Sequence, residues 1–214
     1  MVMNERNEHL ETLQEIRSLM ERSSRFISLS GLSGVAAGVF ALAGAAMVYV
    51  YLGTTPFEHK QLYYVIAQTT SKWGLDYISF FLLDAILILV GALSCGIFFT
   101  TRKARRKGQK TWDALAQRLV INMAIPLSTG AAVCLAMLYH GQIEFIIPST
   151  LVFYGLALVN ASKYTLTDIR YLGFLEIALG IIGLFNIGYG LEIWAIGFGI
   201  LHIVYGIIMY FKYE

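Results

Sequence analysis

Three ionisable side chains lie inside apolar stretches of this sequence. Asp84, Glu176 and His202 are each surrounded by a run of Leu, Ile, Phe, Val, Ala and Gly. A histidine between two carboxyl groups can accept and release protons near neutral pH, and burial disfavours the charged form of a carboxyl group. These residue types therefore predict a proton relay or a proton-coupled substrate site.

Two other roles stay open for the same residues. A protonated carboxyl could be bonded to a serine, a tyrosine or a backbone carbonyl and simply join two helices, or the three side chains could bind a metal ion. Counting about 1.5 Å per helical residue places Asp84 and His202 roughly 10 and 14 Å below the outer boundary of a membrane, and Glu176 roughly 20 Å below it. At these depths the three could form a ladder across the hydrocarbon core.

The composition predicts the elements that position these residues. The chain has 214 residues, of which 57% are hydrophobic and 14% are charged, with a mean hydropathy of +0.64 and a net charge of +2. An average soluble domain is about 25% charged. These values exclude an intrinsically disordered chain, and the two cysteines exclude a disulfide scaffold. We expect an all-α polytopic membrane protein.

Six apolar runs are long enough to cross a bilayer, which takes about 20 residues. They do not show the alternation of β-barrel strands, so we expect one six-helix transmembrane bundle within residues 26–214. The expected spans are 26–52, 77–100, 119–139, 143–161, 169–187 and 191–211.

The basic residues predict the orientation of the bundle. With six spans, the N-terminus, the 101–118 and 162–170 loops and the C-terminus share one side, and Lys60 and Lys72 lie on the other. Lys and Arg concentrate in cytoplasmic loops. We therefore expect both termini in the cytoplasm, the membrane being a bacterial inner (plasma) membrane. The residues on the shared side are Arg6, Arg17, Arg22, Arg25, Arg102, Lys103, Arg105, Arg106, Lys107, Lys110, Arg118, Lys163, Arg170 and Lys212.

Two features inside the spans predict local geometry. Pro126 interrupts the third span, where it should free the carbonyl of Asn122 and kink the helix; Ser128, Thr129 or water could satisfy that carbonyl. Gly34 and Gly38 form a GxxxG pair in the first span. We expect this pair to mediate close helix packing within the bundle, with dimerisation as the alternative.

Other candidate sites carry weaker patterns. His59, His140, Glu144 and Glu192 fall at the outer ends of spans or in the outer loop, where histidine and carboxylate ligands could hold an ion such as zinc. They lack a ligand spacing such as HxxxH, so we expect no metal. The sequence also lacks a phosphate-binding loop, a GxSxG motif and a CxxC motif. We expect no cofactor, and these absences favour a non-enzyme over an enzyme.

Two cytoplasmic segments could bind partners. Apolar residues at helical spacing predict an amphipathic helix over 4–24, within a cytoplasmic segment 1–25. Its acidic polar face favours packing on the bundle or on another protein over anionic lipid. The basic segment 102–110 lacks interleaved aromatic residues, so it is typical of a topology-determining loop and not of a nucleic-acid site.

Two functions follow from these patterns. The first is a proton-coupled transporter or ion-translocating bundle that uses Asp84, Glu176 and His202. The alternative is a non-catalytic membrane scaffold or sensor that binds a cytoplasmic protein through the 4–24 helix and the basic segment. The lipid bilayer is the expected partner in both, and a homo-oligomer is possible in either. Short segments of similar sequence recur weakly along the chain, and they fit two inverted three-span halves or three hairpins equally well.

Overall fold

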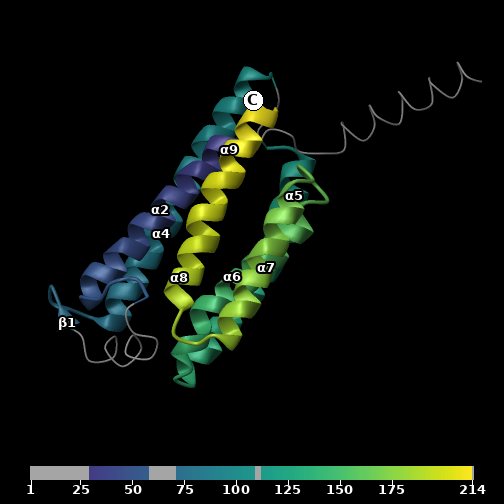
Figure 1. The fold of residues 1–214 in the computed structure, drawn as a ribbon. Coiled ribbons are helices and arrows are strands. Elements are labelled where there is room, and N and C mark those ends of the chain that lie inside the picture. The colour runs from purple at the N-terminus through teal and green to yellow at the C-terminus, as the bar shows by residue number, and fades with distance from the viewer. Residues whose placement is uncertain (1–28, 58–70, 109–111, 214) are drawn as a thin grey trace, which may run out of the picture.

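The computed structural model describes residues 29–57, 71–108 and 112–213 of this protein (Figure 1). These residues are helical apart from loops and one short hairpin. The expected 4–24 helix lies outside the described residues. The helical elements are α2 (Gly31–Leu52), α4 (Tyr77–Arg106), α5 (Ala114–Tyr139), the 3₁₀-helix η1 (Ile143–Phe145), α6 (Ile146–Ala161), α7 (Ile169–Phe185), α8 (Gly190–Trp194), the π-helical segment η2 (Ala195–Leu201) and α9 (His202–Tyr213).

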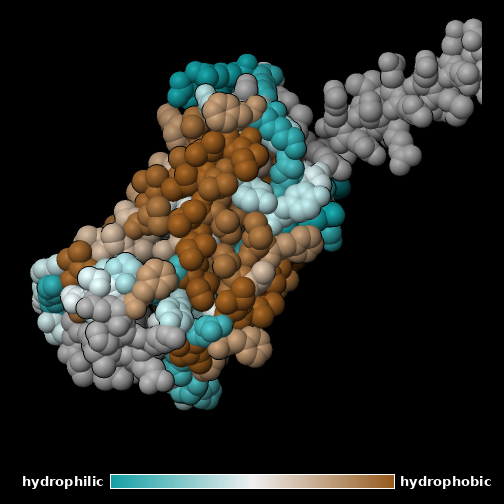
Figure 2. All heavy atoms as spheres, in the orientation of Figure 1, coloured by the Kyte–Doolittle hydropathy of each residue, from teal (hydrophilic) through white to brown (hydrophobic). Residues whose placement is uncertain are grey.

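Five of these helical stretches are long and apolar enough to cross a membrane. The last of them is α8, η2 and α9 taken together, and α7 is shorter, with 17 residues. Apolar side chains cover the middle of the face in Figure 2, and hydrophilic residues gather toward its two ends. Such a band suits a hydrocarbon layer between two aqueous phases. The five stretches are Gly31–Leu52, Tyr77–Arg106, Ala114–Tyr139, Ile143–Ala161 and Gly190–Tyr213.

Several helix boundaries differ from the expected spans by one to six residues, and contacts give a local reason for two of them. The first helix begins at Gly31 and not at 26, because Ser30 is extended and its carbonyl accepts the backbone N–H of Ser33 at 3.2 Å. The second helix continues to Arg106, so most of the expected 102–110 loop is helical. Lys103 helps to hold this extension, since its buried Nζ donates to the Leu29 carbonyl at 2.8 Å.

The long helices form two groups of three (Figure 1). In one group α2 lies between α4 and the η2–α9 stretch, and in the other α6 lies between α5 and α7. The groups meet where α8 packs against α6 and α7 and where η2 packs against α7. This junction brings residues from α6, α7 and α9 together in the middle of the bundle.

A hairpin closes one end of the first group. Strands β1 (Ser71–Lys72) and β2 (Leu75–Asp76) pair across Trp73 and Gly74, which both have the positive φ angles of a tight two-residue turn. The Tyr51 hydroxyl donates to the Leu75 carbonyl at 2.9 Å, and the Tyr51 ring stacks on Phe80 at 3.8 Å. The hairpin thereby connects the end of α2 to the start of α4.

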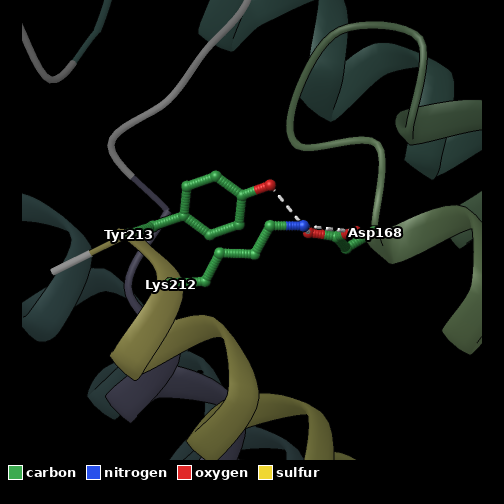
Figure 3. A network of polar contacts seen from close by, with 3 residues as sticks. All are labelled: Asp168, Lys212 and Tyr213. Atoms are coloured by element: carbon green, nitrogen blue, oxygen red, sulfur yellow. Dashed lines mark hydrogen bonds and ion pairs between the residues drawn. The ribbon is translucent and has the colours of Figure 1, made fainter.

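The opposite end is held by a small polar network (Figure 3). Lys212 Nζ and the Tyr213 hydroxyl both donate to Asp168 Oδ2, at 2.8 and 2.7 Å. Lys107 Nζ donates to the Tyr213 carbonyl at 3.2 Å. The ends of α4 and α9 and the start of α7 therefore lie together, as the expected topology requires.

We predict that Asp168→Asn lowers the melting temperature in detergent at neutral pH. Partial burial raises the pKa of Asp168, but the hydrogen bonds from Lys212 and Tyr213 outweigh it and leave that pKa below its usual value. The contribution to stability is therefore present above the unfolded-state pKa, about 3.9, and is lost as the pH falls through the lower folded-state pKa. The difference between variant and wild type should accordingly close in acid. Lys163→Gln, an exposed charge change at the same end, is the control; a difference equally large at acid pH would contradict the assignment.

Candidate proton-transfer site

Glu176 and His202 meet in the interior of the bundle. Glu176 Oε1 lies 3.3 Å from His202 Nδ1, and the two residues are 0% and 5% exposed. On the other side of the ring, His202 Nε2 lies 2.8 Å from the Tyr154 hydroxyl. The three side chains come from α7, α9 and α6, so they form a chain across the junction of the two helix groups.

This site lies near the middle of the helices that carry it. At about 1.5 Å per residue, Tyr154, Glu176 and His202 each fall within about 3 Å of the midpoint of their own helical stretch. An unpaired charge in the middle of a membrane-spanning helix costs several kcal/mol. The protonation states of the three groups must therefore be matched to one another.

The π-helical turn before His202 makes room for the carboxyl group. A Cβ atom at Gly197 would lie 2.5 Å from Glu176 Oε2 and 2.6 Å from Leu151 Cδ2, so only glycine admits the carboxyl here. The Gly197 carbonyl lies 3.0 Å from His202 Nδ1, and the His202 backbone N–H donates to Gly199. Single π-helical turns inside α-helices are frequent at functional sites.

The two nitrogens of His202 allow two arrangements of protons. If Nδ1 carries the proton, it donates to the Gly197 carbonyl while Nε2 accepts from the Tyr154 hydroxyl. If Nε2 carries it, Nε2 donates to Tyr154 and Nδ1 is an acceptor beside Glu176. Among the described residues neither oxygen of Glu176 has a hydrogen-bond partner. The carboxyl group can therefore hold a proton, or lie as a carboxylate beside an imidazolium.

Asp84 lies apart from this pair. It is half-buried on α4, where a Cβ atom at Gly44 of α2 would lie 3.2 Å from its Oδ2 atom. Helix α4 has an extended interface with α2 and none comparable with α7 or α9 among the described residues. The structure thus brings together two of the three residues predicted to form a ladder.

Tyr154 and Gly197 are site residues that the sequence reasoning did not single out. Tyr154 is a hydroxyl-bearing side chain inside the fourth apolar run, and a mid-membrane tyrosine needs a hydrogen-bond partner. That signal could have identified it. Gly197 carries no comparable signal, because its role depends on the π-helical turn and on the neighbouring helix.

Pro126 lies inside α5, and the carbonyl that it frees is satisfied by a neighbouring helix. Nδ2 of Asn160 on α6 donates to the Asn122 carbonyl at 2.8 Å. Ser128 and Thr129, the expected donors, bond instead to the Ile125 carbonyl at 3.0 and 2.9 Å. A serine or threonine hydroxyl in a helix bonds the carbonyl three or four residues before it, which for Ser128 and Thr129 is that of Ile125. Neither hydroxyl therefore reaches the Asn122 carbonyl.

The remaining candidates have structural surroundings. A Cβ atom at Gly34 would lie 3.2 Å from Gly206 Cα, and one at Gly38 would lie 2.5 Å from the Gly199 carbonyl, so this face of α2 packs within the chain. Glu192 accepts from the Phe57 backbone N–H at 3.2 Å and hydrogen-bonds Tyr49.

No metal-binding group appears at the outer end within the described ranges. The His140 ring lies against Tyr139, Glu144 lies in η1, and His59 is outside the described residues. In the described part of the chain no three His, Cys, Asp or Glu residues are grouped to hold a metal ion.

Comparisons of this chain with protein-family models, with curated proteins and with solved structures found no match. What the site does must therefore follow from its own chemistry and geometry.

We predict that Asn160→Ala destabilises the protein by about 1 kcal/mol, because the Asn122 carbonyl loses its donor. In a Pro126→Ala background the backbone N–H of residue 126 can bond that carbonyl, so the same change should cost much less. Unfolding by denaturant titration in mixed micelles measures both values. Asn186→Ala is the control, since Asn186 is exposed and bonds the Ile182 carbonyl of its own helix. An equal loss in both backgrounds would contradict the assignment.

Proposed function

We propose that this protein is a membrane transporter that moves protons, with Glu176, His202 and Tyr154 as its proton-carrying residues. The observation that carries the proposal is the pairing of a fully buried carboxyl group with a buried histidine at mid-membrane depth, 3.3 Å apart. A histidine titrates near neutral pH, and polar residues in this position typically mark proton pathways.

The transfer balances as a simple exchange along the chain of residues. The O–H bond of protonated Glu176 breaks as an N–H bond forms at Nδ1 of His202, leaving a carboxylate beside an imidazolium. The imidazolium then releases its Nε2 proton to the Tyr154 hydroxyl oxygen, while the Tyr154 O–H bond breaks and its proton passes to a water molecule on one side of the membrane. A proton from water on the other side re-forms the O–H bond of Glu176, and exchange with water returns His202 to the Nε2–H form. The pair of Glu176 and His202 stays neutral before and after the first step, which keeps the cost of burial low.

A purely structural role fits the site less well. A carboxyl group that only joins helices would be expected to have both oxygens hydrogen-bonded, since an unpaired buried polar group is costly. The oxygens of Glu176 have no such partners among the described residues. The polar side chain beside it is His202, whose Nδ1 lies 3.3 Å from Oε1, and these two groups can exchange a proton.

The proposal includes six spans and cytoplasmic termini in a bacterial inner membrane. Helix α7, with 17 residues, is at the short end of the length that crosses a bilayer. The basic residues of the described part gather at the end that holds Arg106, Arg170 and Lys212, and Lys72 lies at the other. This distribution supports a cytoplasmic position for the first end.

The test is proton flux in liposomes that contain the purified protein and an entrapped pH dye. A potassium gradient with valinomycin sets an inside-negative potential, and wild-type protein should acidify the lumen. We expect Glu176→Gln to reduce the flux to that of protein-free liposomes. His202→Gln and Tyr154→Phe should reduce it strongly, because each removes one exchangeable proton site.

Glu144→Gln is the matched control, because it removes a carboxyl group outside the membrane core and should leave the flux unchanged. Size-exclusion profiles must show that each variant is folded, and Glu176→Asp provides a variant that keeps the carboxyl group. Equal flux in wild type and folded Glu176→Gln would overturn the proposal.

A further inference from the structure

Asp84 and Glu176 occupy the same position in two helices that share a pattern. Tyr77 begins α4 and Ile169 begins α7, and the same number of residues separates each start from its carboxyl residue. A leucine precedes both carboxyl residues, and a leucine and a glycine follow at equal spacing. The matching sets are Leu83, Asp84, Leu87 and Gly91 in α4 and Leu175, Glu176, Leu179 and Gly183 in α7.

The two helices also pack on their predecessors in the same register. Gly91 of α4 faces Phe40 of α2, and the corresponding Gly183 of α7 faces Pro148 of α6. The next contact toward the carboxyl residue joins Ile88 to Gly44 in the first pair of helices. In the second pair it joins Gly180 to Val152. Both contacts are therefore reproduced at the same spacing on each helix.

The third helix of each set also makes contacts at equivalent positions, in each case with the first helix of the other set. Gly38 of α2 packs against the Gly199 carbonyl of η2. The equivalent pair is Ile146 of α6 and Cys134 of α5, which lie beside each other. Ala195 lies against the apolar cluster of which Ala45 is one member, and at the equivalent positions Gly130 faces Phe153. The set α2, α4 and α5 thus matches the set α6, α7 and α8–α9. With three spans in each, the second set is inverted in the membrane.

The two sets differ in one interface. The α8–η2 stretch packs on α6 and α7 and encloses Glu176, whereas α5 has no extended interface with α2 or α4 among the described residues. Asp84 is accordingly half-buried where Glu176 is fully buried. One carboxyl residue is thus enclosed, and its counterpart is not.

We propose that the two sets are inverted repeats and that Asp84 is a second proton-binding carboxyl, enclosed by α5 when α8–η2 withdraws from Glu176. The repeat follows from the packing, and the proton-binding role of Asp84 rests on the function proposed above. Inverted repeats that exchange conformations give alternating access to the two sides of a membrane.

The correspondence specifies which residues meet in the other state. The contact between Leu151 and Gly197, which encloses Glu176, corresponds to Ala43 and Ala132. Both alanines are exposed in this structure, and small residues permit close helix approach. The counterpart of His202 is Met137, so Asp84 would be enclosed without a basic partner and would hold its proton as a neutral group.

Disulfide trapping tests this inference without any measurement of transport. In liposomes, Ala43→Cys with Ala132→Cys should form an intrachain disulfide under mild oxidation, in a background of Cys95→Ala and Cys134→Ala. Asp84→Asn should raise the yield several-fold, because no charge then needs to be enclosed. Ala43→Cys with Ala131→Cys is the matched control, since residue 131 is exposed but points about 100° away around α5.

The inference is overturned if the Ala43 and Ala132 pair forms no intrachain disulfide while both cysteines react with N-ethylmaleimide. Equal yields from the control pair, or a disulfide that joins two chains, would overturn it as well. A trapped intrachain disulfide without Glu176-dependent flux would support the repeat and contradict the proposed function, so the two failures are distinguishable.

Discussion

Glu176 places two carboxyl oxygens in the middle of the bundle, where His202 is the only ionisable group within ion-pair distance in the described part of the chain. A charge in that position is stable only beside an opposite charge, and a neutral carboxyl needs a proton. The surrounding structure fits this constraint. Gly197 leaves space for the carboxyl, the π-helical turn presents its carbonyl to Nδ1, and Tyr154 holds Nε2. Proton exchange is the chemistry that such a pair can perform with the smallest change in net charge.

Close contact between helix backbones fixes the level in the bundle at which the helices hold these side chains. Glycines of α2 pack on the carbonyls and Cα atoms of α9, and glycines of α7 pack on α6. In a lipid bilayer the hydrophobic effect does not drive helices together, because the lipid tails are as apolar as the helix surfaces. Helix association therefore depends on such close contacts. Side-chain hydrogen bonds between the described helices are few. One of them joins Asn160 to the Asn122 carbonyl that Pro126 frees.

The all-helical fold and its long apolar helices could be predicted from the sequence, because uninterrupted apolar runs of about 20 residues are typical of helices that can cross a bilayer. The starts of α4 and α7 and the end of α2 agree with the expected spans. The start at 26 was wrong, and residues 102–106 continue a helix where a loop was expected, since Ser30 and Lys103 act through contacts that composition does not encode. Within the site, the apolar surroundings of Glu176 and His202 could be read from the sequence, but their contact could not. The rotation of a helix about its axis depends on packing, which also explains why Asp84 was grouped with them.

The most direct test of the central claim is to observe the proton on Glu176. Infrared difference spectra of the protein in lipid, recorded on stepping the pH, should contain a protonated carboxyl C=O band that is lost in Glu176→Gln. The same band should shift in position or in its pH midpoint in His202→Gln, because the histidine is the partner of the carboxyl group. A pH-dependent carboxyl band that is identical in wild type and Glu176→Gln would contradict the account.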